Sequence, residues 1–137
     1  KSNGFYAPIV KANYVKQNFS LGNPKDMVKF HTIQAKHGYT KTTIYIFEKV
    51  AYISDCNDLS IVDSEKLHNL KYLIIDCLKV KDNWAHFNLD DVFYIHSKLK
   101  PSKTILTNLH SDMDYNTLLK ILPKNISPAF DGLKLYC

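Results

Sequence analysis

The alternation of apolar and polar positions predicts a β-sheet in the first half of the chain. Apolar side chains alternate with polar ones over residues 27–36, as in a strand with one buried face. Residues 42–47 are rich in β-branched and aromatic side chains, and residues 50–54 form a short apolar run that suits a strand buried on both faces. Because Glu48-Lys49 reads as a tight connection, these three strands are expected to form an antiparallel meander.

Strand and helix signals alternate in the second half. Asn88 can cap a helix whose first turn carries Asp90 and Asp91, and Pro101 ends the helical pattern. The predicted elements are a buried strand over 72–76, a helix over 89–99, a strand over 104–107, a helix over 114–122 and a final hairpin over 129–136 around Asp131-Gly132. This order predicts an α/β domain whose helices cover one face of a mixed sheet.

The remaining segments carry weaker signals. Residues 1–26 hold several turn signals and are predicted to be an irregular lead-in with one short strand near residues 9–14. Residues 61–70 are predicted to hold a short helix capped by Ser64. The domain proper is placed at residues 27–137. The chain starts at Lys1 without an initiator methionine, so we expect a processed or truncated product.

Length and composition fit one globular domain. The chain has 137 residues, 45% hydrophobic and 23% charged, and no apolar run approaches the roughly 20 residues that a membrane span needs. Three cysteines are too few for a disulfide framework, and no signal peptide is recognisable, so a cytoplasmic location is expected. The net charge of +5 comes entirely from scattered lysines without any arginine, which argues against nucleic acid as the partner.

Histidines and aspartates follow the predicted strands. The five candidates are His37, Asp55, Asp76, His86 and His110. Imidazole nitrogens and carboxylate oxygens together suit zinc, manganese or iron, and an aspartate between two ions can bridge them. Other interpretations stay open: an aspartate after a strand can be a simple turn residue, and each histidine can be an ordinary loop or packing residue. The same holds for Cys56, a ligand or a small core residue.

Six sequence blocks follow one another along the chain. They are Ala35-Lys36-His37-Gly38, Val50-Ala51-Tyr52-Ile53-Ser54-Asp55, Leu73-Ile74-Ile75-Asp76, His86-Phe87-Asn88-Leu89-Asp90, the stretch 106–115 and Pro128-Ala129-Phe130-Asp131-Gly132-Leu133. In this order they resemble the C-terminal half of the metallo-β-lactamase-fold hydrolases. The similarity is greatest to the phosphoribosyl cyclic phosphodiesterases and their bacterial β-lactamase-like relatives, and smaller to ribonuclease Z. The resemblance implies half of an αββα sandwich.

The resemblance also implies a role for each candidate. His37 would bind the first metal, Asp55 would bridge two metals and His110 would bind the second. His86 would act as general acid or hold the phosphate, and Asp76 would orient His86. The implied cofactors are two divalent ions, zinc or manganese, and the implied substrate is a phosphodiester. A carboxylate beside an imidazole favours the protonated ring, which can then donate to a leaving alkoxide.

The chain departs from the family in one respect. The family builds most of its metal site from a His-x-His-x-Asp-His motif in the N-terminal half, and this motif is absent here. Two protein ligands per ion are fewer than the three or four that hold catalytic zinc. The chain is therefore expected to be inactive alone and to need an N-terminal half-chain. The alternative is a non-catalytic interaction domain that forms a homodimer through its exposed sheet face.

Overall fold

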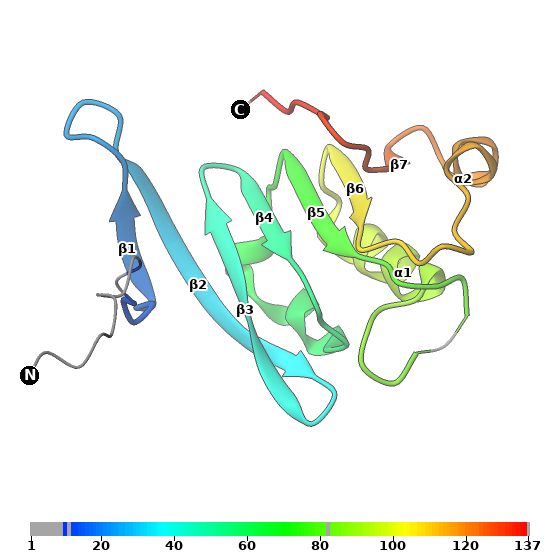
Figure 1. Cartoon of the computed structure of the whole chain (residues 1–137), viewed down its shortest axis with the longest axis horizontal. Coiled ribbons are helices and arrows are strands. Elements are labelled where there is room, and N and C mark those ends of the chain that lie inside the picture. The colour runs from blue at the N-terminus through cyan, green and yellow to red at the C-terminus, as the bar shows by residue number, and fades with distance from the viewer. Residues whose placement is uncertain (1–9, 11, 82, 137) are drawn as a thin grey trace, which may run out of the picture.

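The computed structural model describes residues 10, 12–81 and 83–136, and it contains one seven-stranded mixed sheet whose strands lie in chain order (Figure 1). The strands are β1 (Asn18–Leu21), β2 (Val28–His37), β3 (Thr40–Phe47), β4 (Val50–Ile53), β5 (Tyr72–Asp76), β6 (Lys103–Thr107) and β7 (Ile126–Pro128). The helices are α1 (Leu89–Leu99) and α2 (Tyr115–Ile121), with two 3₁₀ helices, η1 (Leu59–Asp63) and η2 (Glu65–Leu67). The predicted α/β class and mixed sheet are confirmed.

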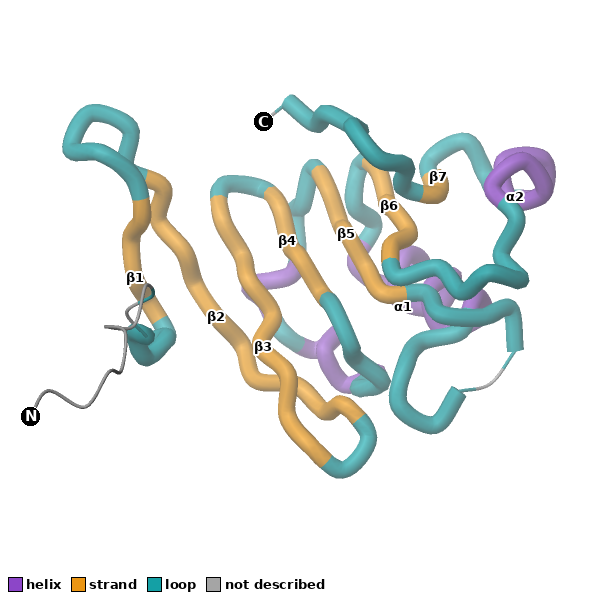
Figure 2. Tube along the Cα trace, in the orientation of Figure 1, coloured by secondary structure: helices purple, strands orange, loops and turns teal. Residues whose placement is uncertain are grey.

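Strands β1 to β4 pair antiparallel, whereas β4 to β7 pair parallel. The predicted meander of β2, β3 and β4 is thus present, and the turn at Gly38 joins the long hairpin of β2 and β3. The connections from β4 to β5 and from β5 to β6 run behind the sheet in Figure 2, where η1, η2 and α1 cover a single face, whereas α2 lies beside β7 at the edge of the sheet. Because parallel strands need such crossovers, the carboxyl ends of β4, β5 and β6 all open at the same edge of the sheet.

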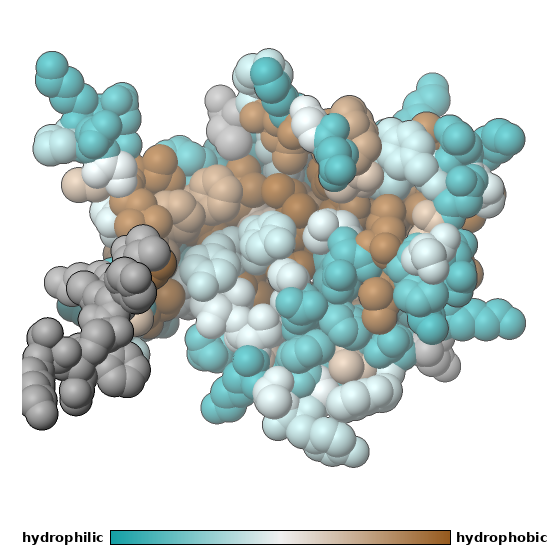
Figure 3. Space-filling model, viewed as in Figure 1, coloured by the Kyte–Doolittle hydropathy of each residue, from teal (hydrophilic) through white to brown (hydrophobic). Residues whose placement is uncertain are grey.

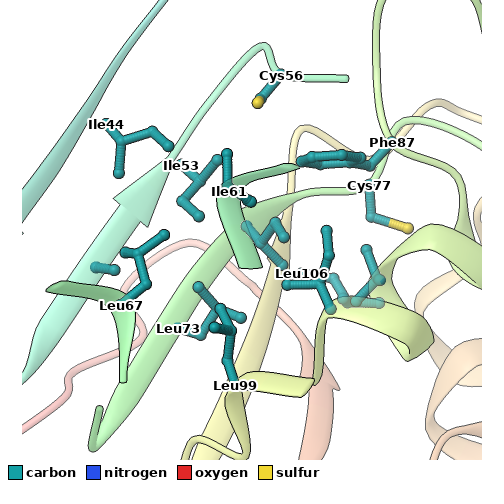
Figure 4. Close-up of a cluster of buried hydrophobic side chains, with 14 of the residues drawn as sticks. Ile44, Ile53, Cys56, Ile61, Leu67, Leu73, Cys77, Phe87, Leu99 and Leu106 are labelled. Carbon is teal, nitrogen blue, oxygen red and sulfur yellow. The ribbon is translucent and has the colours of Figure 1, made fainter. Parts of the chain in front are cut away.

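The core lies between the sheet and these covering helices (Figure 4). Central strands contribute side chains with no exposed area, and Phe87 from the loop before α1 closes the cluster beside them. The residues with zero exposure from strands β3 to β6 are Ile44, Ala51, Ile53, Leu73, Ile75, Asp76, Thr104 and Leu106. These buried residues fix the strands whose ends carry the polar candidates.

The other face of the sheet has no helix over it among the described residues, and part of it is apolar in the view of Figure 3. Phe19, Phe30 and Phe47 occupy paired positions on three neighbouring strands, and each ring lies 5.0 Å from the next between centroids. We call these three residues the phenylalanine row. Tyr45 and Tyr52 pair in the adjacent row, and Tyr52 is 38% exposed. An uncovered sheet face of this kind was expected for half of a sandwich.

Helix α1 begins where the sequence predicts. Asn88 accepts a hydrogen bond from the Asp91 amide at 2.9 Å, and the Asp91 carboxylate accepts one from the Asn88 amide at 3.1 Å. This reciprocal capping box satisfies two amides of the first turn, which explains why local sequence places the helix start correctly. Helix α2 is likewise capped by Asp114, which accepts from the Thr117 amide at 2.8 Å.

Two predicted elements are wrong, and a third is confirmed in part. Of residues 9–14, those that the structure describes form no strand, and the first strand is instead β1, whose place is set by pairing with β2. The short helix predicted within residues 61–70 is the 3₁₀ helix η2, which has Ser64 at its N-cap position but no capping hydrogen bond from the Ser64 side chain. The hairpin over 129–136 does not form, since β7 ends at Pro128 and pairs in parallel with β6.

Candidate functional site

Four of the five predicted side chains meet at one end of the sheet. Asp76 ends β5 and Asp55 follows β4, while His37 ends β2. His86 comes from the loop between β5 and α1 and reaches both carboxylates. Carboxyl ends of adjacent parallel strands share an edge, so side chains far apart in sequence come together there.

Asp76 and His86 form the tightest contact of this cluster. Asp76 Oδ2 lies 2.6 Å from His86 Nδ1 and also accepts from the Cys56 amide at 3.2 Å. The Asp76 side chain has no exposed area, and this burial raises the pKa of its carboxyl, although its hydrogen bonds with His86, Asn108 and Cys56 offset part of the effect. A buried carboxylate in contact with Nδ1 restrains the orientation of the imidazole ring, and the catalytic role assigned to this pair from the sequence stays a prediction.

Asp55 is the more open carboxylate. Its side chain is 50% exposed, and its Oδ1 lies 3.8 Å from His86 Nδ1. Ser54 Oγ donates to Asp55 Oδ2 at 3.0 Å, and Asp55 has a left-handed backbone with φ +50°. A residue with a side chain rarely adopts this conformation, and here it turns the chain sharply at the end of β4. The carboxylate therefore faces solvent at the edge of the site, where a ligand can reach it.

Only one ring nitrogen of His37, Nε2, is left for a ligand, because the other is hydrogen-bonded to the backbone. Its Nδ1 lies 2.9 Å from the Ala85 carbonyl oxygen, and a carbonyl can only accept, so Nδ1 carries the proton. In the neutral ring Nε2 then keeps its lone pair, which is the state that a metal-binding histidine needs. The His37 ring packs edge-on against that of His86, with centroids 4.8 Å apart.

His110 lies in the loop after β6, in contact with its own neighbours. Its Nδ1 is 3.0 Å from Asp112 Oδ2, and the Asp112 amide lies 3.3 Å from the same nitrogen. The metal role assigned to His110 from the sequence stays a prediction.

The donor set fits a divalent metal in part. Asp55, Asp76 and His86 can place ligand atoms within 4.8 Å of one another, and oxygen with imidazole nitrogen suits zinc or manganese. Both oxygens of Asp76, however, already take part in hydrogen bonds, with His86, Cys56 and Asn108. His37 is not part of this group, and its contact with the cluster is through the ring of His86. The orienting role of Asp76 and the metal roles of His37 and Asp55 stay predictions. These two ligands alone would not complete a catalytic site.

Sequence reasoning missed two asparagines that hold the cluster together. Asn108 follows β6 in a left-handed conformation, φ +58°, and its Nδ2 donates to Asp76 Oδ1 at 3.1 Å and to Asp55 Oδ1 at 3.3 Å. Asn57 donates to the Trp84 carbonyl oxygen at 2.6 Å and accepts from the Gly38 amide at 3.1 Å. An asparagine directly after a strand is a signal for a left-handed turn, and it could have marked Asn108.

No known protein-family model matches the sequence, and no curated protein matches it either. Solved structures do match. A new diphosphatase from the PhnP family shares 31% identity and a TM-score of 0.76, over 90% of this chain and 47% of that one. The metallo-β-lactamase-fold protein YhfI from Bacillus subtilis shares 15% identity (TM-score 0.69; 87% and 53% covered). The short form of human tRNase Z, ELAC1, shares 12% (TM-score 0.55; 85% and 46% covered).

These similarities confirm the fold that the sequence blocks implied: the chain is one half of a metallo-β-lactamase-fold domain. It spans about half the length of the structures that it matches. Within the described part of the chain, no helix has the length and hydropathy that a membrane span requires.

Proposed function

We propose that this chain supplies half of the active site of a metal-dependent hydrolase that cleaves phosphodiesters. The observation that carries the proposal is the His86–Asp76 pair at 2.6 Å, with the open carboxylate of Asp55 3.8 Å from the same imidazole nitrogen. The similarity to a PhnP-family diphosphatase adds the diphosphate linkage as a second substrate to test.

Each residue has a task in this scheme. His37, Asp55 and His110 would hold divalent ions, zinc or manganese. Bound ions would activate water and stabilise charge on the phosphoryl oxygens. Asp76 fixes His86 through Nδ1, so that Nε2 of His86 can hold a proton for the leaving oxygen. Asn108 holds the carboxylates of Asp55 and Asp76 next to each other by donating a hydrogen bond to each.

The site needs further ligands from outside the described cluster. The chain spans about half of the similar structures and carries no His-x-His-x-Asp-His sequence. The phenylalanine row lies on the uncovered face of the same sheet, because Phe47 alternates along β3 with Ile44 and Ile46, which point into the core. We assign this face to a complementary half-chain, because docking there would complete both the sandwich and the metal site. The partner is thus a protein segment of similar length with imidazole and carboxylate ligands.

Activity and metal content test the proposal. The chain should hold little zinc or manganese alone, and it should hydrolyse bis(p-nitrophenyl) phosphate only when co-purified with a complementary half. His86→Gln should lower turnover while metal content stays unchanged, whereas His37→Ala should lower both. His68→Gln serves as the matched control, since His68 is exposed in another part of the molecule. Robust turnover by the isolated chain would contradict the half-site.

The uncovered face also supports a second candidate, a non-catalytic interaction domain. Exposed aromatic residues on a sheet favour association even without catalysis. Light scattering after size exclusion separates the two functions. A homodimer that is independent of concentration, binds no metal and rejects the complementary half would favour the interaction domain. A monomer that binds the complementary half and then takes up metal would favour the hydrolase.

A further inference from the structure

Two large aromatic side chains stand exposed beside the site. Tyr39 is 97% exposed and Trp84 is 69% exposed, yet their rings are in contact, with centroids 5.3 Å apart at an angle of 41°. Tyr39 follows His37 by two residues, and Trp84 precedes His86 by two. Neither ring is part of the core or of the phenylalanine row. Their contact is a surface feature that packing of this half alone does not require.

The backbone around the two rings is held by hydrogen bonds. The Asn57 side chain bridges the β2–β3 turn and the β5–α1 loop: it accepts from the Gly38 amide and donates to the Trp84 carbonyl oxygen. His37 adds a second link to that loop through the Ala85 carbonyl. The same two segments that carry the site histidines therefore also carry the rings, at a fixed separation from the site.

Gly38 is fitted to the indole. It has φ +54°, and a Cβ added there would lie 2.3 Å from a ring carbon of Trp84. The indole thus lies directly over the turn, in space that only glycine leaves free. One ring edge is supported by backbone while most of the ring stays open to solvent.

Two exposed lysines lie close to the rings along the chain. Lys36 and Lys41 are direct partners across the β2–β3 ladder, on either side of the turn that carries Tyr39. Like charges directly opposite each other are destabilising. Asp58 interacts with Lys36 and offsets part of this repulsion, and a bound phosphate would offset more of it. The rings offer a planar surface for a base, and the lysines and the proposed site suit a phosphate group. Together they match a planar base joined to phosphate.

We propose that Tyr39 and Trp84 form a stacking platform for the base of a nucleoside phosphate. Aromatic side chains bind bases through their π faces without selecting one base strongly. The platform defines the substrate class of the proposed hydrolase as nucleotide rather than simple sugar phosphate, and in that respect it rests on the proposed function. Tyr39 and Trp84 bind the base, and the histidines and aspartates act on the phosphate.

Intrinsic fluorescence tests the platform directly, because Trp84 is the only tryptophan of the chain. Adenosine 5′-monophosphate should change the emission of the full chain in a saturable way, and ribose 5-phosphate should bind at least about tenfold more weakly. Tyr39→Ala should weaken binding of the nucleotide by about tenfold, and Tyr39→Phe should restore it. Equal affinities for the two phosphates, or no effect of Tyr39→Ala, would overturn the platform.

Two further variants test whether the change in binding is specific to the platform. Tyr136→Ala removes another exposed tyrosine, 75% exposed and far along the chain, and should leave nucleotide binding unchanged. Gly38→Ala should displace the indole and weaken nucleotide binding, with circular dichroism confirming that the fold is kept. The binding measurement needs neither metal nor turnover. Nucleotide binding without metal-dependent hydrolysis would contradict the proposed function alone, and hydrolysis without base preference would contradict the platform alone.

Discussion

The antiparallel and parallel parts of the sheet differ in what they bury and in what they offer to a ligand. Strands β4, β5 and β6 contribute side chains with no exposed area, and Asp76 is buried at their carboxyl end. Strands β1, β2 and β3 leave the phenylalanine row partly open and end in a turn with the exposed Tyr39. The parallel part, strands β4, β5 and β6 with the residues packed on them, therefore supports the site, and we call it the floor of the site. The antiparallel part provides surfaces for partners.

The largest expected effect of a single substitution lies in the floor. Phe87 has no exposed area and anchors the loop that carries His86, so Phe87→Ala should lower the free energy of unfolding by about 3–5 kcal/mol. Urea denaturation measures the change. Phe130→Ala is the control, because Phe130 is 53% exposed and should matter by less than about 1 kcal/mol. Similar losses for both variants would contradict a floor that is more tightly packed than its surroundings.

Removing the buried carboxylate should come next in size. Asp76→Ala leaves the Cys56 amide and His86 Nδ1 without this acceptor and leaves Asn108 with only Asp55, at a cost of about 2–4 kcal/mol. Thermal or urea unfolding shows the loss. Asp131→Ala, an exposed position, is the matched control and should be close to neutral. An unchanged stability would mean that the polar network contributes nothing to the floor.

A smaller loss is expected in the antiparallel part. Phe30 stacks between Phe19 and Phe47 but stays partly exposed, so Phe30→Ala should cost about 1–2 kcal/mol. The same variant should weaken binding of the complementary half-chain more than it weakens the fold. Met27→Ala removes a 51% exposed side chain next to β2 and serves as the control. A cost as large as that of Phe87→Ala would remove the contrast between the two parts.

The smallest effect concerns pH. His96 on α1 lies with Nδ1 2.7 Å from Thr104 Oγ1 and Nε2 2.7 Å from Asn125 Nδ2, and burial lowers its pKa. The unfolded chain binds a proton at His96 below about pH 6.5, before the folded chain does. Stability should therefore be complete above that pH and decline as the pH falls further. His96→Gln should flatten the decline in urea unfolding, and His68→Gln should not.

Local signals predicted most of the fold, and pairing decided what they missed. Helix α1 is set by Asn88 and Asp91 within one turn, and the apolar run before Asp76 defines β5 by itself. Strand β1 is only four residues long and exists because β2 is long enough to pair with it. Asp131-Gly132 looks like a hairpin turn, but the partner of β7 is β6, across helix α2, and a local pattern cannot show that.

The same distinction applies to the site. Asp55, Asp76 and His37 could be found because each lies at or just after the end of a strand signal, and strand ends gather at one edge. His86 lies in the loop between β5 and α1. Asn57 and Asn108 act by bridging loops that are distant in sequence, so their roles depend on tertiary contacts. His110 follows β6 as expected, but which atom its ring contacts is decided by the neighbouring Asp112.

Two thiols lie next to the floor of the site. Cys56, whose amide donates to Asp76, and Cys77, which follows Asp76 in the chain, are both buried, and burial raises the pKa of Cys56 to about 11 and that of Cys77 to about 12. At neutral pH neither is a thiolate, so an alkylating reagent must wait for the region to open. In a Cys137→Ser background, the labelling rate of these thiols would time that opening residue by residue. A bound partner or ion would lower the labelling rate of the two thiols, and this change can be measured without any catalytic product.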